Sequence, residues 1–452
     1  MKKNNIKLSI IALTSLAILI GCNSSDTTHT KQGIWERKGY GLVVKISQDD
    51  KVVKSYDFTR ETCLESTIGL EEIKTFFNKA KLSPDKNTLE SNYIKVSRLD
   101  ELPQSCVDNR LITSPTATNT FKHLWHNFND YYAFFDERNV DWAAQYSIYA
   151  PQVNDDMSKE VLFQLMSNML KSINDEHVSL FTDEIYFNPA QDSKSEIKIK
   201  QAFLEQNDIK NIDEFTTQIF STYQSTLMSY FDENSTKVIN DEFFTATINS
   251  NIGYMIINGM DEFSEGNDEA DDLKAIHQLM QKVMENFKDT DGMIIDVRLN
   301  SGGYDSVSLA IASYFTDEKK KVYSKKAKYW AGETEEVDIY IEPSKQSYLK
   351  PVIVIAGDDT VSAGEIFLMT MSKLSNVKLI GENSAGIFSD MLVKSLANDW
   401  SVSLSNEVYY NLNGKKVEVV GITPDINVSV FSIEDIINGR DDAIETALQI
   451  LN

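Results

Sequence analysis

The chain has 452 residues and a formal net charge of −24, from 44 basic and 68 acidic residues. An acidic surface of this kind repels nucleic acid and anionic lipid, which excludes both as predicted partners. The acidic residues are spread along the whole chain, which indicates a role in solubility and not a single binding patch. The length is typical of about two to four domains.

Residues 1–21 have the pattern of an export signal. Three lysines precede the apolar run Ile10 to Ile20, which is too short to span a bilayer. The run ends in Leu19-Ile20-Gly21-Cys22, which resembles a bacterial lipobox, in which the cysteine is lipidated. An ordinary signal peptide with an incidental cysteine is the alternative. We expect lipidation of Cys22, a tether at residues 22–32 and a protein anchored in the cell envelope, facing the periplasm or the exterior.

Two cysteines remain for the globular part, Cys63 and Cys106. An exported protein folds in an oxidising compartment, so a disulfide between them is predicted, with two buried free thiols as the alternative. No later segment is long and apolar enough to be predicted as a membrane span.

The first half of the mature chain divides into three predicted units. Residues 33–110 form a small β-rich domain, in which Leu42-Val43-Val44 follow a glycine kink. After a linker, residues 118–183 form a helical subdomain, where apolar residues from Leu162 to Ile173 recur at helical spacing. Residues 184–248 form a helical insertion. Its Tyr186 to Asp241 stretch is polar and low in glycine.

From residue 249 to 452 the pattern changes to alternating strands and helices, which predicts an α/β core. Met293 to Val297 and Val352 to Ile355 are buried strands, and Leu273 to Phe287 is an amphipathic helix. Val402 to Tyr410 and Lys416 to Val420 are expected as added strands.

The stretch Thr360-Val361-Ser362-Ala363-Gly364-Glu365 follows a buried strand and opens a helix. A serine at such a turn exposes its hydroxyl beside unpaired backbone N–H groups, which favour a developing oxyanion. This is the position of a nucleophile in an acyl-transfer enzyme. A plain helix N-cap is the alternative for Ser362, and on this hexamer alone it is the commoner role.

The string Asp296 to Gly303 ends another buried strand at the edge where α/β folds place their sites. Gly302 and Gly303 let backbone N–H groups approach a ligand closely, which suggests half of an oxyanion hole. A tight strand-to-helix turn is the alternative.

His177 is the best-placed general base among the five histidines, because it follows a helix end in the acidic loop Asn174-Asp175-Glu176. The neighbouring carboxylates are expected to keep its proton affinity high. An exposed loop histidine is the alternative. Glu418 lies in an alternating apolar pattern and is either a solvent-facing carboxylate or the group that orients the base.

Taken in order, these elements resemble the tail-specific (C-terminal processing) serine peptidases, on the branch similar to the tricorn protease core. The resemblance runs from about Phe121 to Leu451, interrupted at Tyr186 to Asp241. It implies an α/β core of the ClpP/crotonase-like type, preceded here by the helical subdomain and the small β-rich domain. The glycine loop Gly381 to Gly386 and the string Gly421 to Asp425 also match the family.

The resemblance implies a role for each matching residue. Ser362 is the nucleophile, His177 its base, and Glu418 the outer carboxylate of the tricorn-type tetrad. The backbone N–H groups of Ala363 and of Gly302 or Gly303 hold the oxyanion.

Two positions depart from the family pattern. Ile387 stands where the processing branch has its catalytic lysine, so the base is expected to be His177. Glu176 stands where the tricorn branch has a serine that bridges histidine and glutamate. Either Glu176 orients His177 directly, or another group bridges to Glu418. The insertion also lacks the carboxylate-binding loop of a PDZ domain, so recognition of substrate C-termini is not predicted.

The predicted function is that of a lipid-anchored serine peptidase outside the cytoplasm, acting on peptides or unfolded protein segments through an acyl-enzyme. A non-catalytic protein that binds an apolar ligand or peptide on the same fold is one alternative, and an esterase is another. No ligand cluster or phosphate-binding loop predicts a metal ion or a nucleotide cofactor.

Overall fold

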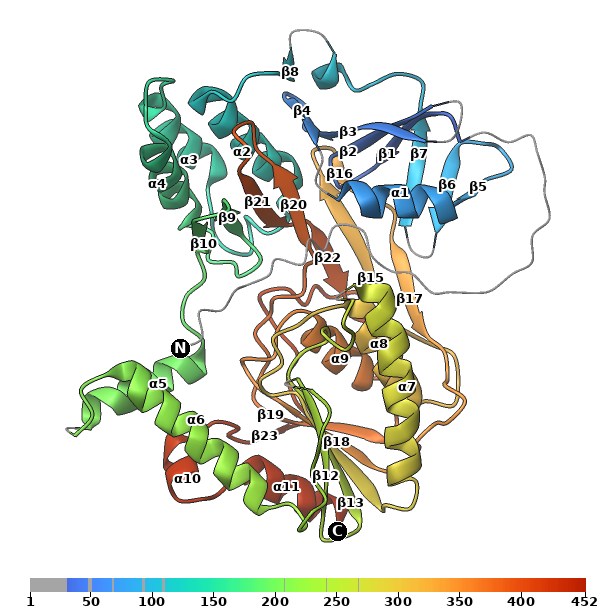
Figure 1. Cartoon of the computed structure of the whole chain (residues 1–452), viewed down its shortest axis with the longest axis vertical. Helices are drawn as coiled ribbons and strands as arrows, with labels where there is room; N and C mark the ends of the chain where they lie inside the picture. The colour runs from blue at the N-terminus through green and yellow to red at the C-terminus, as the bar shows by residue number, and fades with distance from the viewer. Residues whose placement is uncertain are drawn as a thin grey trace.

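Figure 1 shows the computed structural model of the chain, which describes residues 31–47, 51–66, 69–91, 94–107, 110–206, 208–240, 242–266 and 268–452. The predicted signal segment and Cys22 lie outside these residues. An upper lobe carries the N-terminal strands and the first helices, and a lower lobe carries the later part of the chain (Figure 1). Within the described ranges, we find no helix long and apolar enough to cross a membrane.

The described part of the N-terminal domain is an eight-stranded sheet in the order β5-β6-β7-β1-β2-β3-β4-β8. Helix α1 (Leu70–Lys79) packs on one face, where Phe76 and Phe77 join a core around the fully buried Trp35. A disulfide joins Cys63 to Cys106, as expected, with 4.9 Å between their Cα atoms. The strands are β1 (Gly33–Arg37), β2 (Leu42–Ile46), β3 (Val52–Phe58), β4 (Cys63–Ser66), β5 (Lys81–Leu82), β6 (Thr88–Ser91), β7 (Ile94–Leu99) and β8 (Leu111–Ile112).

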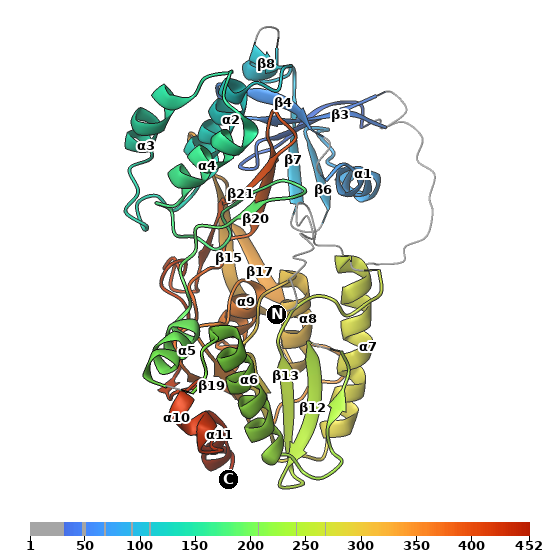
Figure 2. The ribbon, with the colours of Figure 1, turned by 60° about the vertical axis from the view of Figure 1, so that its left-hand side comes forward.

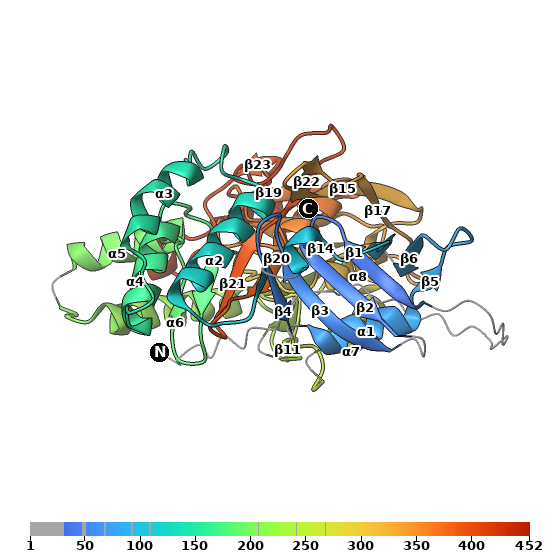
Figure 3. The same ribbon diagram turned by 90° about the horizontal axis from the view of Figure 1, so that it is seen from above.

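The helical subdomain contains α2 (Ala117–Tyr131), α3 (Trp142–Tyr149) and α4 (Lys159–Leu170), which lie beside the N-terminal sheet when the molecule is seen from above (Figure 3). Each helix begins at a side chain that accepts a hydrogen bond from the backbone, namely Thr116, Asp141 and Ser158. The chain then forms β9 (Ser179–Phe181), which pairs with β10 (Tyr186–Phe187) and β21 (Ser401–Ser405); β20 (Met391–Ser395) completes this sheet. This pairing joins the subdomain to the C-terminal part of the chain.

The core of the lower lobe is a sheet whose described strands run in the order β11-β12-β13-β14-β18-β19-β23. The pairs from β13 to β23 are parallel, whereas β12 pairs antiparallel with β13 along its whole length. Strands β11 and β12 fall inside the segment 184–248 predicted as an insertion, so the core sheet begins earlier than expected. The bounds are β11 (Lys237–Val238), β12 (Phe243–Ile248), β13 (Ile252–Ile257), β14 (Gly292–Asp296), β18 (Val352–Ala356), β19 (Val377–Gly381) and β23 (Ile426–Asn427).

Helices cover both faces of this core sheet. Strand side chains alternate between the faces, so Met293 and Ile295 of β14 contact one apolar cluster and Ile294 contacts the other. The first face is covered by α7 (Glu269–Phe287), α8 (Asp305–Ala312) and α9 (Ala363–Met371), and the second by α6 (Ile212–Ser229) and α11 (Asp442–Leu451). Figure 2 shows α7 and α8 on the side of the sheet away from α11.

The remaining helices belong to the lower lobe, and a long strand reaches from that lobe towards the N-terminal domain (Figure 1). Helix α5 (Lys194–Glu205) packs with α6 and α10 (Ile433–Ile437) around Phe215 and Phe431. Strand β15 (Lys320–Tyr329) pairs with β16 (Gly332–Glu333), β17 (Val337–Ile341) and β22 (Glu407–Tyr410), and extends from the core towards the N-terminal domain (Figure 2). There the Asn406 side chain donates to the backbone oxygen of Gly39 over 2.9 Å.

The expected strand at Lys416 to Val420 is absent from the described structure. The segment forms one isolated bridge, between Tyr410 and Lys416, and then a turn. Val419 has a φ of 67°, which a β-branched residue in a strand does not adopt. The apolar alternation around Glu418 therefore comes from residues packed into a turn and not from a pleated strand.

Candidate active site

Ser362 lies in the sharp turn between β18 and α9. Its backbone has φ 53° and ψ −123°, a strained conformation for a residue other than glycine. Its N–H donates to the backbone oxygen of Ile387 over 2.9 Å. Ser362 occupies the N-cap position of α9, but its side chain makes no cap hydrogen bond, so the hydroxyl is not used to cap the helix. A serine held in a strained strand-to-helix turn presents its hydroxyl at the top of the sheet, as a nucleophile requires.

The Gly302-Gly303 turn lies directly against Ser362. A Cβ atom built on Gly302 would come within 2.7 Å of the Ser362 Cβ, and both glycines have positive φ, 94° and 131°. The turn is held by Met260, whose N–H donates to the Gly302 oxygen over 2.6 Å. The strand end therefore brings the predicted oxyanion turn and the predicted nucleophile together.

Two backbone N–H groups at this junction have no hydrogen-bond partner among the described residues, those of Gly303 and Ala363. The N–H of Gly302 donates instead to the Asn300 side chain over 3.0 Å. Of the two glycines predicted for the oxyanion hole, Gly303 is thus the one with a free donor. The sequence did not single out Asn300, although an asparagine often accepts from the backbone N–H two residues later in a turn.

His177 is buried between α4 and β9 and is not an exposed loop residue. Its backbone N–H donates to Asp175 Oδ1 over 3.0 Å, and its backbone oxygen accepts from the Ser403 hydroxyl over 2.8 Å. Burial lowers the pKa of His177 below its ordinary value, although Asp175 and a hydrogen bond with the Ser389 backbone act to raise it. The expectation that neighbouring carboxylates keep its proton affinity high is therefore wrong, because desolvation is the larger effect.

Ser362 and His177 both contact the segment Ile387 to Ser389, which brings them to the same edge of the core. Their side chains share no hydrogen bond in the described structure, and His177 Nδ1 is buried without a partner there. Catalytic hydrogen bonds are often long before substrate binds and shorten in the complex.

Glu418 is buried and holds the same segment. Its Oε2 accepts from the N–H groups of Phe388 and Ser389, over 2.8 and 3.0 Å. Its Oε1 accepts from Arg138 Nη2 over 3.1 Å. Burial, followed by the charge of Asp175, raises the pKa of Glu418 to about 8. No hydrogen bond joins Glu418 to His177 among the described residues, so its links to the base run through Arg138 and Asp175 and through the Ser389 backbone.

Arg138 and Asp175 were both missed as site residues. Arg138 Nε lies 3.4 Å from Asp175 Oδ2, which also accepts from the Tyr132 hydroxyl over 2.8 Å. Asp175 had a detectable signal, because an aspartate often accepts from the backbone N–H two residues later in a turn. Arg138 had none, since it lies far from His177 and Glu418 in the sequence.

Glu176, predicted as a possible orienting group, has an exposed side chain. Its charged neighbours are the carboxylates of Asp175, Asp359 and Glu196. A carboxylate surrounded by carboxylates and turned to solvent is poorly placed to orient an imidazole. Asp175, one residue earlier, accepts from the backbone N–H of His177 instead.

Glu365 anchors the glycine loop to the helix that begins after Ser362. Its fully buried carboxylate accepts from the Ser384 hydroxyl and from the N–H groups of Gly386 and Ile387, over 2.6, 2.7 and 2.6 Å. Burial raises its pKa to about 7. Glu365 thus fixes Ile387, and the backbone oxygen of Ile387 accepts from the backbone N–H of Ser362. The Glu365 carboxylate therefore stabilises the Ser362 turn through Ile387.

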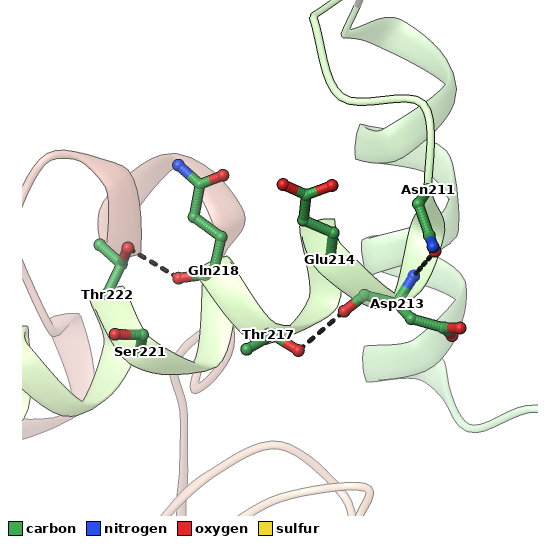
Figure 4. A pocket seen from close by; sticks show the side chains of 7 residues that line it. All are labelled: Asn211, Asp213, Glu214, Thr217, Gln218, Ser221 and Thr222. Carbon is green, nitrogen blue, oxygen red and sulfur yellow. Dashed lines mark hydrogen bonds between the residues drawn. The ribbon is translucent and has the colours of Figure 1, made fainter. Parts of the chain in front are cut away.

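An open hollow on the surface of α6 is a separate feature of the molecule (Figure 4). None of the predicted site residues lines it. All its lining side chains are polar, and they are Asn211, Asp213, Glu214, Thr217, Gln218, Ser221 and Thr222. Such a lining is typical of a solvated helix face.

Comparison with known proteins agrees with the class that this fold and site define, the serine peptidases. Residues 251–428 match the family described as Peptidase family S41, and residues 116–171 match the Tricorn protease C1 domain. The core of this chain is thus similar to the S41 serine peptidases, and its helical subdomain is similar to the tricorn C1 domain.

Two curated relatives are carboxy-terminal processing proteases. CtpA of Bacillus subtilis is 26% identical over 143 residues, which is 32% of this chain and 30% of that protein. The protein of Bartonella bacilliformis is 27% identical over 140 residues, which is 30% of this chain and 31% of that protein. The chain thus aligns with less than a third of either relative's length. Among solved structures, a candidate peptidase of Parabacteroides merdae superposes with a TM-score of 0.58 at 25% identity, over 74% of this chain and 96% of that one.

Proposed function

We propose that the protein is a serine peptidase that cleaves peptides or unfolded protein segments through an acyl-enzyme on Ser362. The observation that carries the proposal is the junction of the strained Ser362 turn with the free N–H groups of Gly303 and Ala363. Donors fixed before the reaction stabilise the charge that develops on the substrate carbonyl oxygen.

In the proposed reaction, the Ser362 Oγ attacks the scissile carbonyl carbon while His177 accepts its proton. The carbonyl oxygen becomes an oxyanion that accepts hydrogen bonds from Gly303 and Ala363. His177 then protonates the leaving amine, and the C–N bond breaks to leave an ester on Ser362. Water, deprotonated by His177, hydrolyses that ester and restores the enzyme.

The electrostatic environment suits His177 as the base. Because its pKa is lowered by burial, the imidazole is neutral near pH 7 and is able to accept a proton. No lysine follows the glycine loop, where Ile387 stands. The proposed base is therefore a histidine and not the lysine of the processing branch.

We further propose that the protein is anchored outside the cytoplasm by lipid on Cys22. The Cys63–Cys106 disulfide supports an oxidising compartment. Cys22→Ser is expected to move the protein from the membrane fraction to the soluble fraction. A variant that stays with the membrane to the same extent as the wild type would contradict the anchor.

The catalytic proposal is tested by labelling with a fluorophosphonate, which reacts with activated serines. Wild-type protein is expected to be labelled at Ser362, and Ser362→Ala to lose labelling and about 10⁶-fold in turnover. His177→Ala is expected to be nearly as damaging. Ser372→Ala, at the exposed end of the same helix, serves as the matched control.

The outcomes also separate the alternatives. A wild-type protein that is never labelled would favour a non-catalytic binding protein. Labelling at Ser362 with turnover of esters but of no peptide would favour an esterase. Labelling together with peptide turnover supports the peptidase.

A further inference from the structure

Arg138 occupies a position between the two parts of the chain that carry the candidate catalytic residues. It follows α2 in a turn in which its N–H donates to the Phe134 oxygen over 3.0 Å. Only 10% of its side chain is exposed, and the side chains of Asp175 and Glu418 are fully buried. A long cationic side chain is thus enclosed with two carboxylates from distant segments.

Each nitrogen of the guanidinium faces a different acceptor. Nη1 donates to the backbone oxygen of Asn174, Nε lies 3.4 Å from Asp175 Oδ2, and Nη2 donates to Glu418 Oε1 over 3.1 Å. The rigid planar fork of arginine fixes the positions of such acceptors relative to one another, which the single point charge of a lysine does not do. Arg138 therefore fixes Glu418 relative to the Asn174-Asp175 loop.

Both ends of this arrangement reach the candidate catalytic groups. At one end, Asp175 accepts from the backbone N–H of His177. At the other, Glu418 holds the N–H groups of Phe388 and Ser389, and the Ser389 backbone contacts the imidazole of His177. Asp175 thus fixes the backbone of His177, Glu418 fixes the segment that contacts its imidazole, and the two carboxylates share one cation.

We propose that Arg138 is a positioning residue, which couples Glu418 to His177 through Asp175 and so takes the place of the bridging serine that Glu176 replaces. The inference rests on the proposed function of His177 as the base. It assigns Glu418 an indirect action, since Glu418 makes no hydrogen bond with the imidazole among the described residues.

The arrangement also has an electrostatic consequence. Burial has the largest effect on the pKa of His177 and lowers it; among the groups around it, Asp175 and the Ser389 backbone raise the pKa and Arg138 lowers it. Without Arg138, the charge of Asp175 is no longer balanced. The pKa of His177 is therefore expected to rise, and the acid limb of the activity profile moves to higher pH.

The experiment compares Arg138→Gln, Glu418→Gln and the double variant with the wild type. Arg138→Gln is expected to lower kcat/KM about 10- to 100-fold, mainly through kcat, as for other groups that orient a reactive residue. The acid limb is expected to move up in pH, and the double variant to be no worse than Arg138→Gln. Losses that multiply in the double variant, or an unmoved acid limb, would overturn the inference.

A matched control comes from the same two segments. Lys416 pairs with Glu137 over 2.7 Å, and the side chains are 41% and 26% exposed. Lys416→Gln therefore removes a neighbouring cation that bridges the same parts of the chain at the surface. It is expected to leave kcat/KM and the acid limb at wild-type values, and an equal effect from this variant would contradict a specific role of Arg138.

A second variant covers the case in which Arg138→Gln does not fold. Arg138→Lys keeps the charge and loses the fork, so it is expected to lower kcat while leaving the acid limb near its wild-type position. Wild-type kcat/KM in Arg138→Lys would overturn the inference.

Titration of His177 by NMR distinguishes failure of this inference from failure of the proposed function. The chain has five histidines, so a His177→Gln variant assigns the resonance. A wild-type protein without activity or labelling would contradict the proposed function alone, and the pKa comparison between wild type and variants still tests the coupling. An active wild type whose His177 pKa and kcat are unchanged by Arg138→Gln would contradict only the coupling.

Discussion

The strained backbone at Ser362 leads to a prediction about stability. If the turn is strained because a side chain is present at φ 53°, Ser362→Gly should relieve the strain and Ser362→Ala should retain it. Both variants remove the hydroxyl, so the comparison between them isolates the effect of the Cβ atom. Ser362→Gly is therefore expected to be more stable than Ser362→Ala. At a residue with negative φ the order is usually the reverse, with glycine less stable than alanine.

The magnitude follows from two opposing effects. A non-glycine residue in such a region costs about 1–3 kcal/mol. Replacing alanine with glycine removes that cost, but it raises the conformational entropy of the unfolded chain, which lowers the stability by about 0.4–1 kcal/mol. We expect Ser362→Gly to exceed Ser362→Ala by about 1 kcal/mol in free energy of unfolding.

Ser372, at the other end of the same helix, provides the control. Its φ is −59°, and its hydroxyl donates to the Met369 oxygen, so both substitutions lose the same hydrogen bond. There Ser372→Gly is expected to be less stable than Ser372→Ala by about 0.5–1 kcal/mol. At each serine, the free energy of unfolding of the alanine variant is subtracted from that of the glycine variant. The value at Ser362 minus the value at Ser372 then gives the strain energy of the Ser362 turn.

The assay is urea unfolding of the four variants, with the slopes required to agree so that the surface exposed on unfolding is the same in all four. The expected result is the opposite order of glycine and alanine at the two serines. The same order at both positions, with alanine more stable, would refute the claim that the Ser362 turn stores strain.

Three further predictions concern the geometry, the proton and the disulfide. Gly302→Ala places a Cβ 2.7 Å from the Ser362 Cβ, so kcat/KM should fall about 100-fold. The control is Gly332→Ala, because Gly332 also has a positive φ but a Cβ there meets nothing within 4 Å; this variant should retain activity. Because burial lowers the pKa of His177, the imidazole stays neutral at mildly acidic pH, and kcat/KM should fall only below pH 6.5, the ordinary histidine pKa. A midpoint of the acid limb above pH 6.5 would contradict the assignment of His177 as the base. The double variant Cys63→Ala, Cys106→Ala removes the disulfide between cysteines 43 positions apart in the sequence. Because the unfolded chain then gains conformational freedom, the free energy of unfolding should fall by about 4 kcal/mol relative to the oxidised wild type.

Much of the candidate site was predictable because its signals are local. The buried run of β18, the turn at Ser362 and the apolar face of α9 are read from consecutive residues. The Gly302-Gly303 turn after β14 is likewise recognised from consecutive residues of the sequence. Parallel strands end at one edge of a sheet, so two such turns after neighbouring strands are expected to meet, and β14 does pair with β18.

Other parts were wrong or missed because they depend on distant residues. Strand β12 was assigned to the insertion, and only its pairing with β13 shows that it belongs to the core sheet. Glu418 was expected in a strand but lies in a turn whose shape depends on contacts with the glycine loop, such as the Val419 N–H to Gly386 oxygen bond of 2.7 Å.

The sequence by itself determined the order of the elements, the serine turn, the glycine pair and the histidine loop, because periodicity and turn chemistry act over a few residues. Only the tertiary structure decided that Gly303 and not Gly302 has the free N–H, since Asn300 occupies the other. It also decided that burial lowers the pKa of His177, and that Arg138 joins Asp175 to Glu418. Desolvation and buried ion pairs depend on what surrounds a group in space, and the neighbours in the chain do not specify those surroundings.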